Sequence, residues 1–165
     1  AIGNGYAINA IIGKKRFMKG AEKSFISSTF WTEGIGSTAA LATIKEIYRT
    51  KSWKKITRMG KYIKKRWFDL SIKYNLNLNI TGLDSIPRFE MNKNFEIYKV
   101  FITKKLIEKN ILSSNYIYLS TAHSKKIVDK YLNELEKIFK IIAVTNLKEI
   151  YNQVKKNLPD YVYKK

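Results

Sequence analysis

The sequence contains no cysteine, one histidine and only 13 acidic residues among its 165 positions. The absence of cysteine excludes disulfides and cysteine chemistry, although it does not identify a compartment. A lone histidine cannot build a metal site without partners, and no carboxylates cluster beside His123. We therefore expect no metal, and we expect His123 to have a structural role just before a helix that Ser124 caps.

Long apolar runs are missing as well. No run approaches eighteen residues and no secretory h-region occurs, so we expect neither a membrane span nor export, and hence a cytoplasmic protein. The sequence also lacks a Walker loop, a zinc-ligand spacing and a Ser-His-Asp arrangement. What is present is 45% hydrophobic residues, which argues against disorder, in a chain long enough for one core or for one core plus a subdomain.

Basic residues far outnumber acidic ones, 32 to 13, for a net charge of +19. Such a balance attracts nucleic acid and anionic surfaces. The charge is concentrated only in residues 51–75, which contain nine basic residues and one acidic residue, a net charge of +8. Because lysine dominates over arginine and no five basic residues are consecutive, we favour a solvated helix face and do not expect nucleic acid as a partner. A basic module that binds nucleic acid or an anionic surface remains the alternative.

A loop rich in hydroxyls and glycine carries the strongest functional signal, in residues 25–42. Ser27, Ser28 and Thr29 are consecutive, two glycines follow, and Ser37 or Thr38 is placed to cap a helix that begins near residue 39. Unpaired amides and partial positive charge at a helix start favour an anion, most often a phosphate. From composition alone, an ordinary capped loop is the alternative.

The remaining elements are read from their periodicity. Residues 6–13 are predicted to form a buried strand, and residues 52–74 a helix with one apolar stripe. Alternation predicts short strands at 76–80 and 116–119 and, after Pro87, an edge strand at 88–91. Further helices are predicted at 95–109, 125–142 and 147–156.

These elements predict an α/β to α+β fold in four parts. Residues 1–50 form a strand, phosphate loop and helix, and residues 51–75 a long connecting helix. Residues 76–143 form a small domain with a three-stranded sheet packed on helices, and residues 144–165 a short helix and a loose tail.

Two motifs resemble class III pyridoxal-phosphate aminotransferases, on the branch similar to glutamate-1-semialdehyde aminomutase. They are AIGNGYAINAIIGKK followed by FISSTFWTEGIGSTAALATI, and the later YLSTAHS that leads into IVDKYLNELEKIF. The resemblance covers residues 1–143 and implies part of a fold-type-I transferase: a remnant of its large cofactor domain and its small C-terminal domain. The expected protein is therefore the C-terminal fragment of an enzyme that transfers an amino group to an aldehyde or keto group.

The resemblance also implies roles for residues. The lysine that holds the cofactor as a Schiff base is expected immediately before Ala1, so the chain supplies no catalytic residue and we expect the fragment alone to be inactive. Gly3 and Gly5 match the turn behind that lysine. Ser28 and Thr29 match the pair that binds the cofactor phosphate, with Thr29 facing the cofactor of the other subunit of a homodimer.

After the phosphate-binding threonine, the semialdehyde enzymes usually have a short loop that ends in Asn-Pro. The corresponding loop of this chain, residues 30–37, is longer and lacks that proline. This favours a divergent branch that acts on sugars or other aldehydes, with a small amino donor as the second substrate. Trp31 is a candidate for contacting the substrate, with packing as its alternative role, and Arg88 is a candidate for binding a substrate carboxylate.

Overall fold

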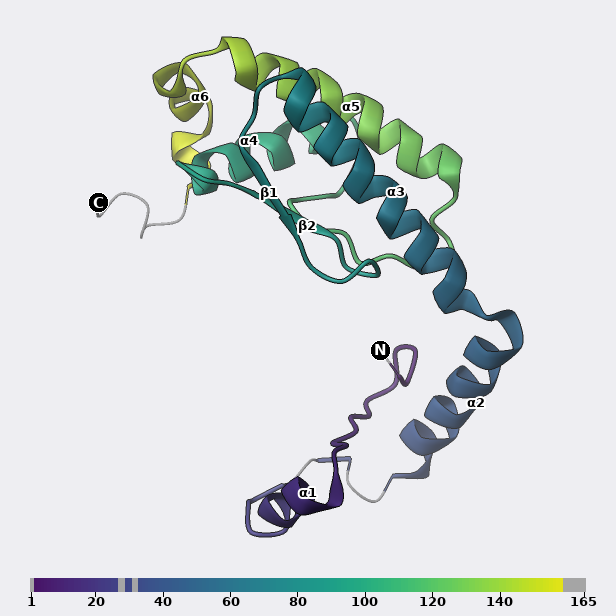
Figure 1. Cartoon of the computed structure of the whole chain (residues 1–165). Helices are drawn as coiled ribbons and strands as arrows, with labels where there is room; N and C mark the ends of the chain where they lie inside the picture. Colours follow the sequence, from purple (N-terminus) through teal and green to yellow (C-terminus); the bar gives the residue numbers. More distant parts are fainter. Residues whose placement is uncertain (1, 27–28, 31–32, 159–165) are drawn as a thin grey trace. The chain divides into compact units, whose positions relative to one another are not determined.

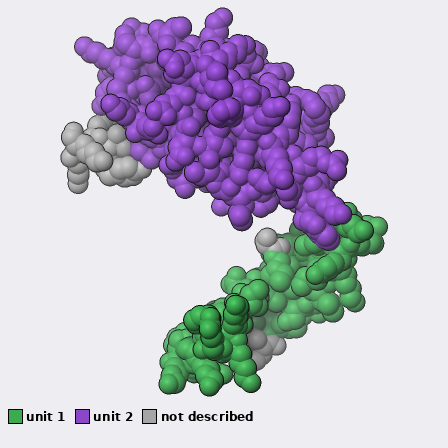
Figure 2. Space-filling view, in the orientation of Figure 1, with its two compact units in different colours: residues 1–52 green, residues 53–165 purple. Residues whose placement is uncertain are grey.

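The computed structural model describes residues 2–26, 29–30 and 33–158. The chain divides into two compact units, residues 1–52 and residues 53–165 (Figure 2). Figure 1 shows the order of the helices and strands along the chain.

The first unit contains two helices, α1 (Lys15–Ala21) and α2 (Gly34–Thr50). The predicted helix start near residue 39 is five residues too late, because Glu33 is the N-cap of α2 and the Thr38 hydroxyl donates to the Gly34 carbonyl at 2.9 Å inside the helix. Lys51, with φ 49°, ends α2 in the left-handed region.

The predicted buried strand at residues 6–13 is wrong. The segment is extended but pairs with no strand among the described residues, and its side chains are mostly exposed, Ile12 to 90%. A β-branched run becomes a strand only when a neighbour accepts its backbone hydrogen bonds, and no described segment does so.

The second unit is built around α3 (Ser52–Lys73) and α5 (Lys125–Val144), with α4 (Phe95–Ile107) and α6 (Leu147–Val154) completing its helices; a 3₁₀ turn (Lys155–Asn157) follows. The apolar stripe predicted for residues 52–74 supplies Ile63, Trp67 and Leu70 to the core, so this helix packs within the unit. The side chains of α5 that are buried are Val128, Tyr131, Leu132, Leu135, Ile138, Phe139 and Ile142.

The sheet has two antiparallel strands, β1 (Leu78–Thr81) and β2 (Arg88–Met91), with Leu78 opposite Met91 and Thr81 opposite Arg88. The predicted third strand at 116–119 is reduced to one bridge between Tyr116 and Arg88. Backbone bonds from Ile117 N–H to the Pro87 carbonyl (3.1 Å) and from Leu119 N–H to the Ser85 carbonyl (3.1 Å) continue the antiparallel pattern. The next bridge would need an N–H at residue 87, which proline lacks, so the ladder stops.

The C-terminal segment contributes to the same core. Ile150 and Val154 of α6 are fully buried and Leu158 is 6% exposed. The predicted loose tail falls on residues 159–165, outside the described part of the chain.

Candidate functional site

A tight turn opens the first unit. Tyr6 N–H donates to the Gly3 carbonyl at 3.1 Å, and the two residues between them, Asn4 (φ 46°) and Gly5 (φ 107°), both have positive φ. Two positive φ values are the requirement of a type I′ turn, which Asn-Gly meets best. A Cβ on Gly3 would lie 2.3 Å from the Tyr6 carbonyl oxygen, so the turn needs glycine there as well.

The extended segment after this turn lies against the start of α2. A Cβ on Gly36 would lie 2.6 Å from the Ala7 carbonyl oxygen, and Gly36 is buried. The absence of a side chain at Gly36 therefore permits the backbone of the segment to approach the first turn of the helix.

A cavity of about 760 Å³ lies where the segment, α1, the hydroxyl loop and the start of α2 meet. Its lining consists of Tyr6, Ala7, Ile8, Asn9, Ile11, Met18, Ile26, Phe30, Glu33, Gly36 and Ser37. The first four amides of α2 have no acceptor within their own helix, which makes this end a donor of hydrogen bonds. Among the described residues of the lining, Glu33 is the only charged one, and the Tyr6 and Ser37 hydroxyls are groups that could bond to an anion.

Thr29 is exposed in a turn between two residues of this lining, Ile26 and Phe30. Glu33 N–H donates to the Phe30 carbonyl at 3.1 Å. Ser28 and Trp31 lie outside the described residues.

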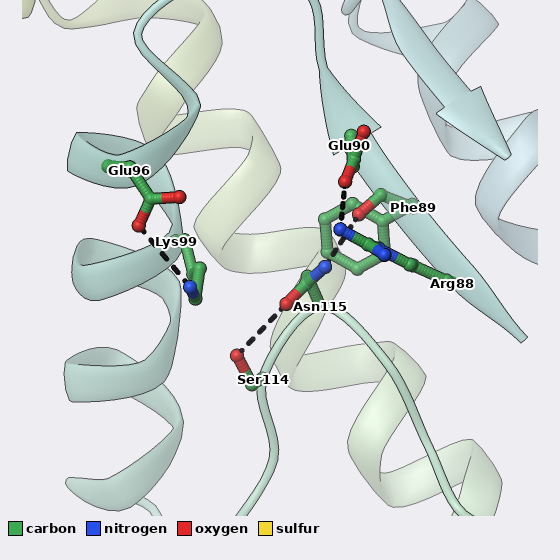
Figure 3. A network of polar contacts seen from close by, with 7 residues as sticks. All are labelled: Arg88, Phe89, Glu90, Glu96, Lys99, Ser114 and Asn115. Atoms are coloured by element: carbon green, nitrogen blue, oxygen red, sulfur yellow. Dashed lines mark hydrogen bonds and ion pairs between the residues drawn. The ribbon is translucent and has the colours of Figure 1, made fainter. Parts of the chain in front are cut away.

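Arg88 belongs to the other unit and lines a separate cavity of about 530 Å³. Its guanidinium is bound to the carboxylate of Glu90 two positions along β2, and its side chain is half exposed (Figure 3). Tyr116, Tyr118 and Lys99 line the same cavity, and none of them was predicted as a site residue. The sequence did offer one signal for the tyrosines: they are two residues apart in the predicted strand at 116–119, so they share one face of it. The structure places Tyr116 opposite Arg88.

His123 holds a loop before α5. Its Nδ1 accepts the Ser120 N–H at 3.0 Å, and the Ser124 hydroxyl accepts the Ile127 N–H at 3.3 Å as the N-cap of the helix. The described residues contain no group of three histidine, cysteine or acidic side chains arranged to hold a metal ion.

Several cations of the basic helix α3 bind acceptors within the second unit. Lys64 pairs with Asp84 at 3.0 Å, and Lys73 pairs with Glu136 at 2.6 Å. The Lys55 ammonium donates to the Thr121 carbonyl at 2.7 Å. A groove of about 960 Å³ runs along the adjacent α5 and is lined by lysines and their carboxylate partners, among other residues. Among the described residues, no helix is long and apolar enough to span a bilayer.

No protein-family model matches the chain. Glutamate-1-semialdehyde 2,1-aminomutase of Methanosphaera stadtmanae is 26% identical over 165 residues, which cover 88% of this chain and 37% of that protein. 3-Aminobutyryl-CoA aminotransferase of Cloacimonas acidaminovorans is 30% identical over 121 residues, 70% of this chain and 29% of that protein. The chain thus spans between 29% and 37% of the length of the curated relatives that it matches.

The fold is similar to part of the solved structure of the Sphingopyxis sp. MTA144 FumI protein in its PLP internal aldimine form. The TM-score is 0.70 at 18% sequence identity, over 98% of this chain and 38% of that chain. A separate sequence match, acetylornithine aminotransferase of Methanocaldococcus jannaschii, is 26% identical over 84% of this chain and 35% of its own length.

Proposed function

We propose that this chain, which resembles the C-terminal part of class III pyridoxal-phosphate-dependent aminotransferases, serves an enzyme that transfers an amino group to an aldehyde or ketone. One observation carries the proposal. The glycine turn ends at Tyr6, Thr29 directly precedes Phe30 in the sequence, and both Tyr6 and Phe30 line one cavity at the start of α2. The turn, the hydroxyl loop and the helix follow one another along the chain in the order that the resemblance implies.

The residues present fit the phosphate end of the cofactor. Gly36 lets the backbone at Ala7 approach the first turn of α2, and the amides of that turn would donate to an anion. The exposed Thr29 hydroxyl would donate to a phosphate oxygen, and Ser28 would assist it. Gly3 and Gly5 would let the backbone turn tightly behind the lysine that the resemblance implies.

Pyridoxal phosphate, when bound, supplies the electron sink for amino transfer, and the protein supplies orientation. The residues of this chain would bind the cofactor phosphate and orient the cofactor, but none of them is a lysine at the turn that could transfer a proton. Lys14 and Lys15 follow a whole extended segment and stand at the start of α1. We therefore propose that the isolated chain is inactive and that catalysis requires the lysine expected before Ala1.

A homodimer is part of the proposal, with Thr29 reaching the cofactor of the other subunit. The support is the exposure of Thr29 on its own chain. The proposed cytoplasmic setting rests on the substrates, which are a small amino donor and an aldehyde or keto acceptor.

The test measures binding of pyridoxal phosphate to the 165-residue chain by equilibrium dialysis, with pyridoxal as the ligand that lacks phosphate. We expect pyridoxal phosphate to bind more tightly than pyridoxal. Thr29→Val should weaken the phosphate form about tenfold, the loss of one charge-assisted hydrogen bond, and Thr29→Ser should retain it. Equal binding of the two ligands, or equal binding by the Val and Ser variants, would contradict the proposal.

Arg88 stays a candidate for binding a substrate carboxylate. A carboxylate would have to displace Glu90 from its guanidinium, because the two are already bound to each other. The basic-module alternative rests on the +8 of residues 51–75, but Lys55, Lys64 and Lys73 have acceptors in the fold. It requires polyanion binding that falls steeply with salt, and absence of binding at low ionic strength would end it.

A further inference from the structure

The cavity beside Arg88 is a built polar site in the second unit. It measures about 530 Å³ and is lined by residues of the turn after β1, the outer face of β2, the start of α4 and the segment 115–118. Figure 3 shows Arg88, Glu90, Glu96, Lys99 and Asn115 of this lining.

Strand alternation directs these side chains away from the core. Phe89 is fully buried, so its neighbours Arg88 and Glu90 lie on the opposite face of β2. Ile117 packs against the core in the same way, which places Tyr116 and Tyr118 on the outer face beside Arg88. The two tyrosine rings meet edge to face with centroids 5.4 Å apart.

Asn115 fixes this wall. It is only 3% exposed, its amide donates to the Phe89 carbonyl at 3.2 Å, and its side-chain oxygen accepts the Ser114 hydroxyl at 3.3 Å. Its own carbonyl accepts the Phe89 N–H at 2.9 Å. A buried amide whose two ends are both bonded holds the tyrosine segment in register with β2.

The charges of the cavity cancel. Arg88 is paired with Glu90, and Lys99 is paired with Glu96 at 3.3 Å (Figure 3). Among the described residues of the lining, two basic and two acidic side chains balance each other, in a chain of +19. An anionic ligand would have to displace a carboxylate, whereas a neutral ligand with several hydroxyls can bond to both partners of each pair without separating them.

The walls are aromatic and open. Tyr118 is 68% exposed and Tyr116 is 43% exposed, so the rings offer flat apolar surface next to their own hydroxyls. The apolar C–H face of a pyranose or furanose is a partner for such a ring. We propose that this cavity binds a neutral, polyhydroxylated, sugar-like ligand.

The experiment is saturation-transfer NMR on the full 165-residue chain without pyridoxal phosphate, with glucose and N-acetylglucosamine as neutral probes and succinate and glucose 6-phosphate as anionic ones. We expect the neutral sugars to bind in the millimolar range and more tightly than succinate. Tyr118→Ala should raise the dissociation constants of the neutral sugars about two- to tenfold, which is the value of one aromatic contact. Tyr118→Trp keeps an aromatic ring at this position and should bind them as the unchanged chain does.

Tyr48→Ala, at a tyrosine of α2 that is 70% exposed in the other unit, is the matched control and should change nothing. Preference for the anionic probes, no sugar binding, or equal loss in the two alanine variants overturns the proposal. Thr29→Val separates the two proposals, because it should impair pyridoxal phosphate binding and leave the sugar signal intact.

Discussion

Gly60 of α3 lies directly against the carbonyl of Asp84, in the turn between β1 and β2. A Cβ at position 60 would lie 1.6 Å from the Asp84 oxygen and 2.5 Å from its carbon. The helix therefore approaches the turn backbone to backbone, and Lys64 one turn later binds both the Gly82 carbonyl at 2.6 Å and the Asp84 carboxylate at 3.0 Å.

Gly60→Ala should destabilise the second unit in spite of the higher helix propensity of alanine. Propensity alone would favour the variant by about 1 kcal/mol. The clash is with backbone, which cannot rotate away, so we expect a net loss of about 3 kcal/mol in the free energy of unfolding, measured in urea. Gly20→Ala in α1, where a Cβ meets nothing within 4 Å, is the control and should not destabilise. A neutral Gly60→Ala would mean that α3 does not pack on this turn.

Phe89→Ala should cost about 3 to 5 kcal/mol. The Phe89 ring is fully buried and meets Trp67 at 4.9 Å and Phe139 at 5.8 Å, both edge to face, so it joins the sheet to α3 and α5. The measurement is chemical denaturation followed by tryptophan fluorescence. Phe68→Ala on α3 removes a ring that is 56% exposed and should cost much less. Equal losses in the two variants would contradict the described core.

The free energy of unfolding should fall in acid, because protonation of Glu136 breaks its ion pair with Lys73 between α5 and α3. Glu136 accepts the Lys73 ammonium at 2.6 Å and the Tyr74 hydroxyl at 3.2 Å. The hydrogen bond from Lys73 lowers the pKa of Glu136 more than burial raises it, and that from Tyr74 lowers it further. The unfolded chain then binds protons more tightly than the folded one. The contribution is complete above the ordinary pKa of glutamate and is lost as pH falls through the lowered pKa.

The basic limb has the opposite sign. Glu136 raises the pKa of Lys73, so that contribution is present below the ordinary pKa of lysine and is lost as pH rises through the raised pKa. Glu136→Gln should flatten both limbs of the curve of unfolding free energy against pH. Unchanged limbs in Glu136→Gln would show that the ion pair is absent in solution.

The first unit should be cleaved by proteases before the second. Its buried residues among those described are Gly3, Gly36 and Ala40, while Ile12, Phe25 and Tyr48 are 90%, 95% and 70% exposed. A unit without a core of large side chains opens readily. Limited proteolysis with mass spectrometry should cut first before residue 53 and leave a resistant product that contains α3–α6. Early cleavage inside α5 would contradict this order.

The sequence determined the helices and the two paired strands of the second unit, because their patterns are local. The stripe of α3 follows from its spacing, β2 was predicted at its observed bounds of 88–91, and Asn110, with φ 57°, lies just beyond α4. The Asn-Gly turn at residues 3–6 is likewise a property of two adjacent residues.

The tertiary structure decided what depends on a neighbour. The run at 6–13 has strand composition but no partner among the described residues, and the ladder to 116–119 stops where Pro87 has no N–H to donate. The pairing of Arg88 with Glu90 and the placement of both tyrosines over one neutral cavity were equally hidden from the sequence, because they depend on which face of each strand the core takes. Periodicity specifies the faces of an element, but only packing selects which partner each face meets.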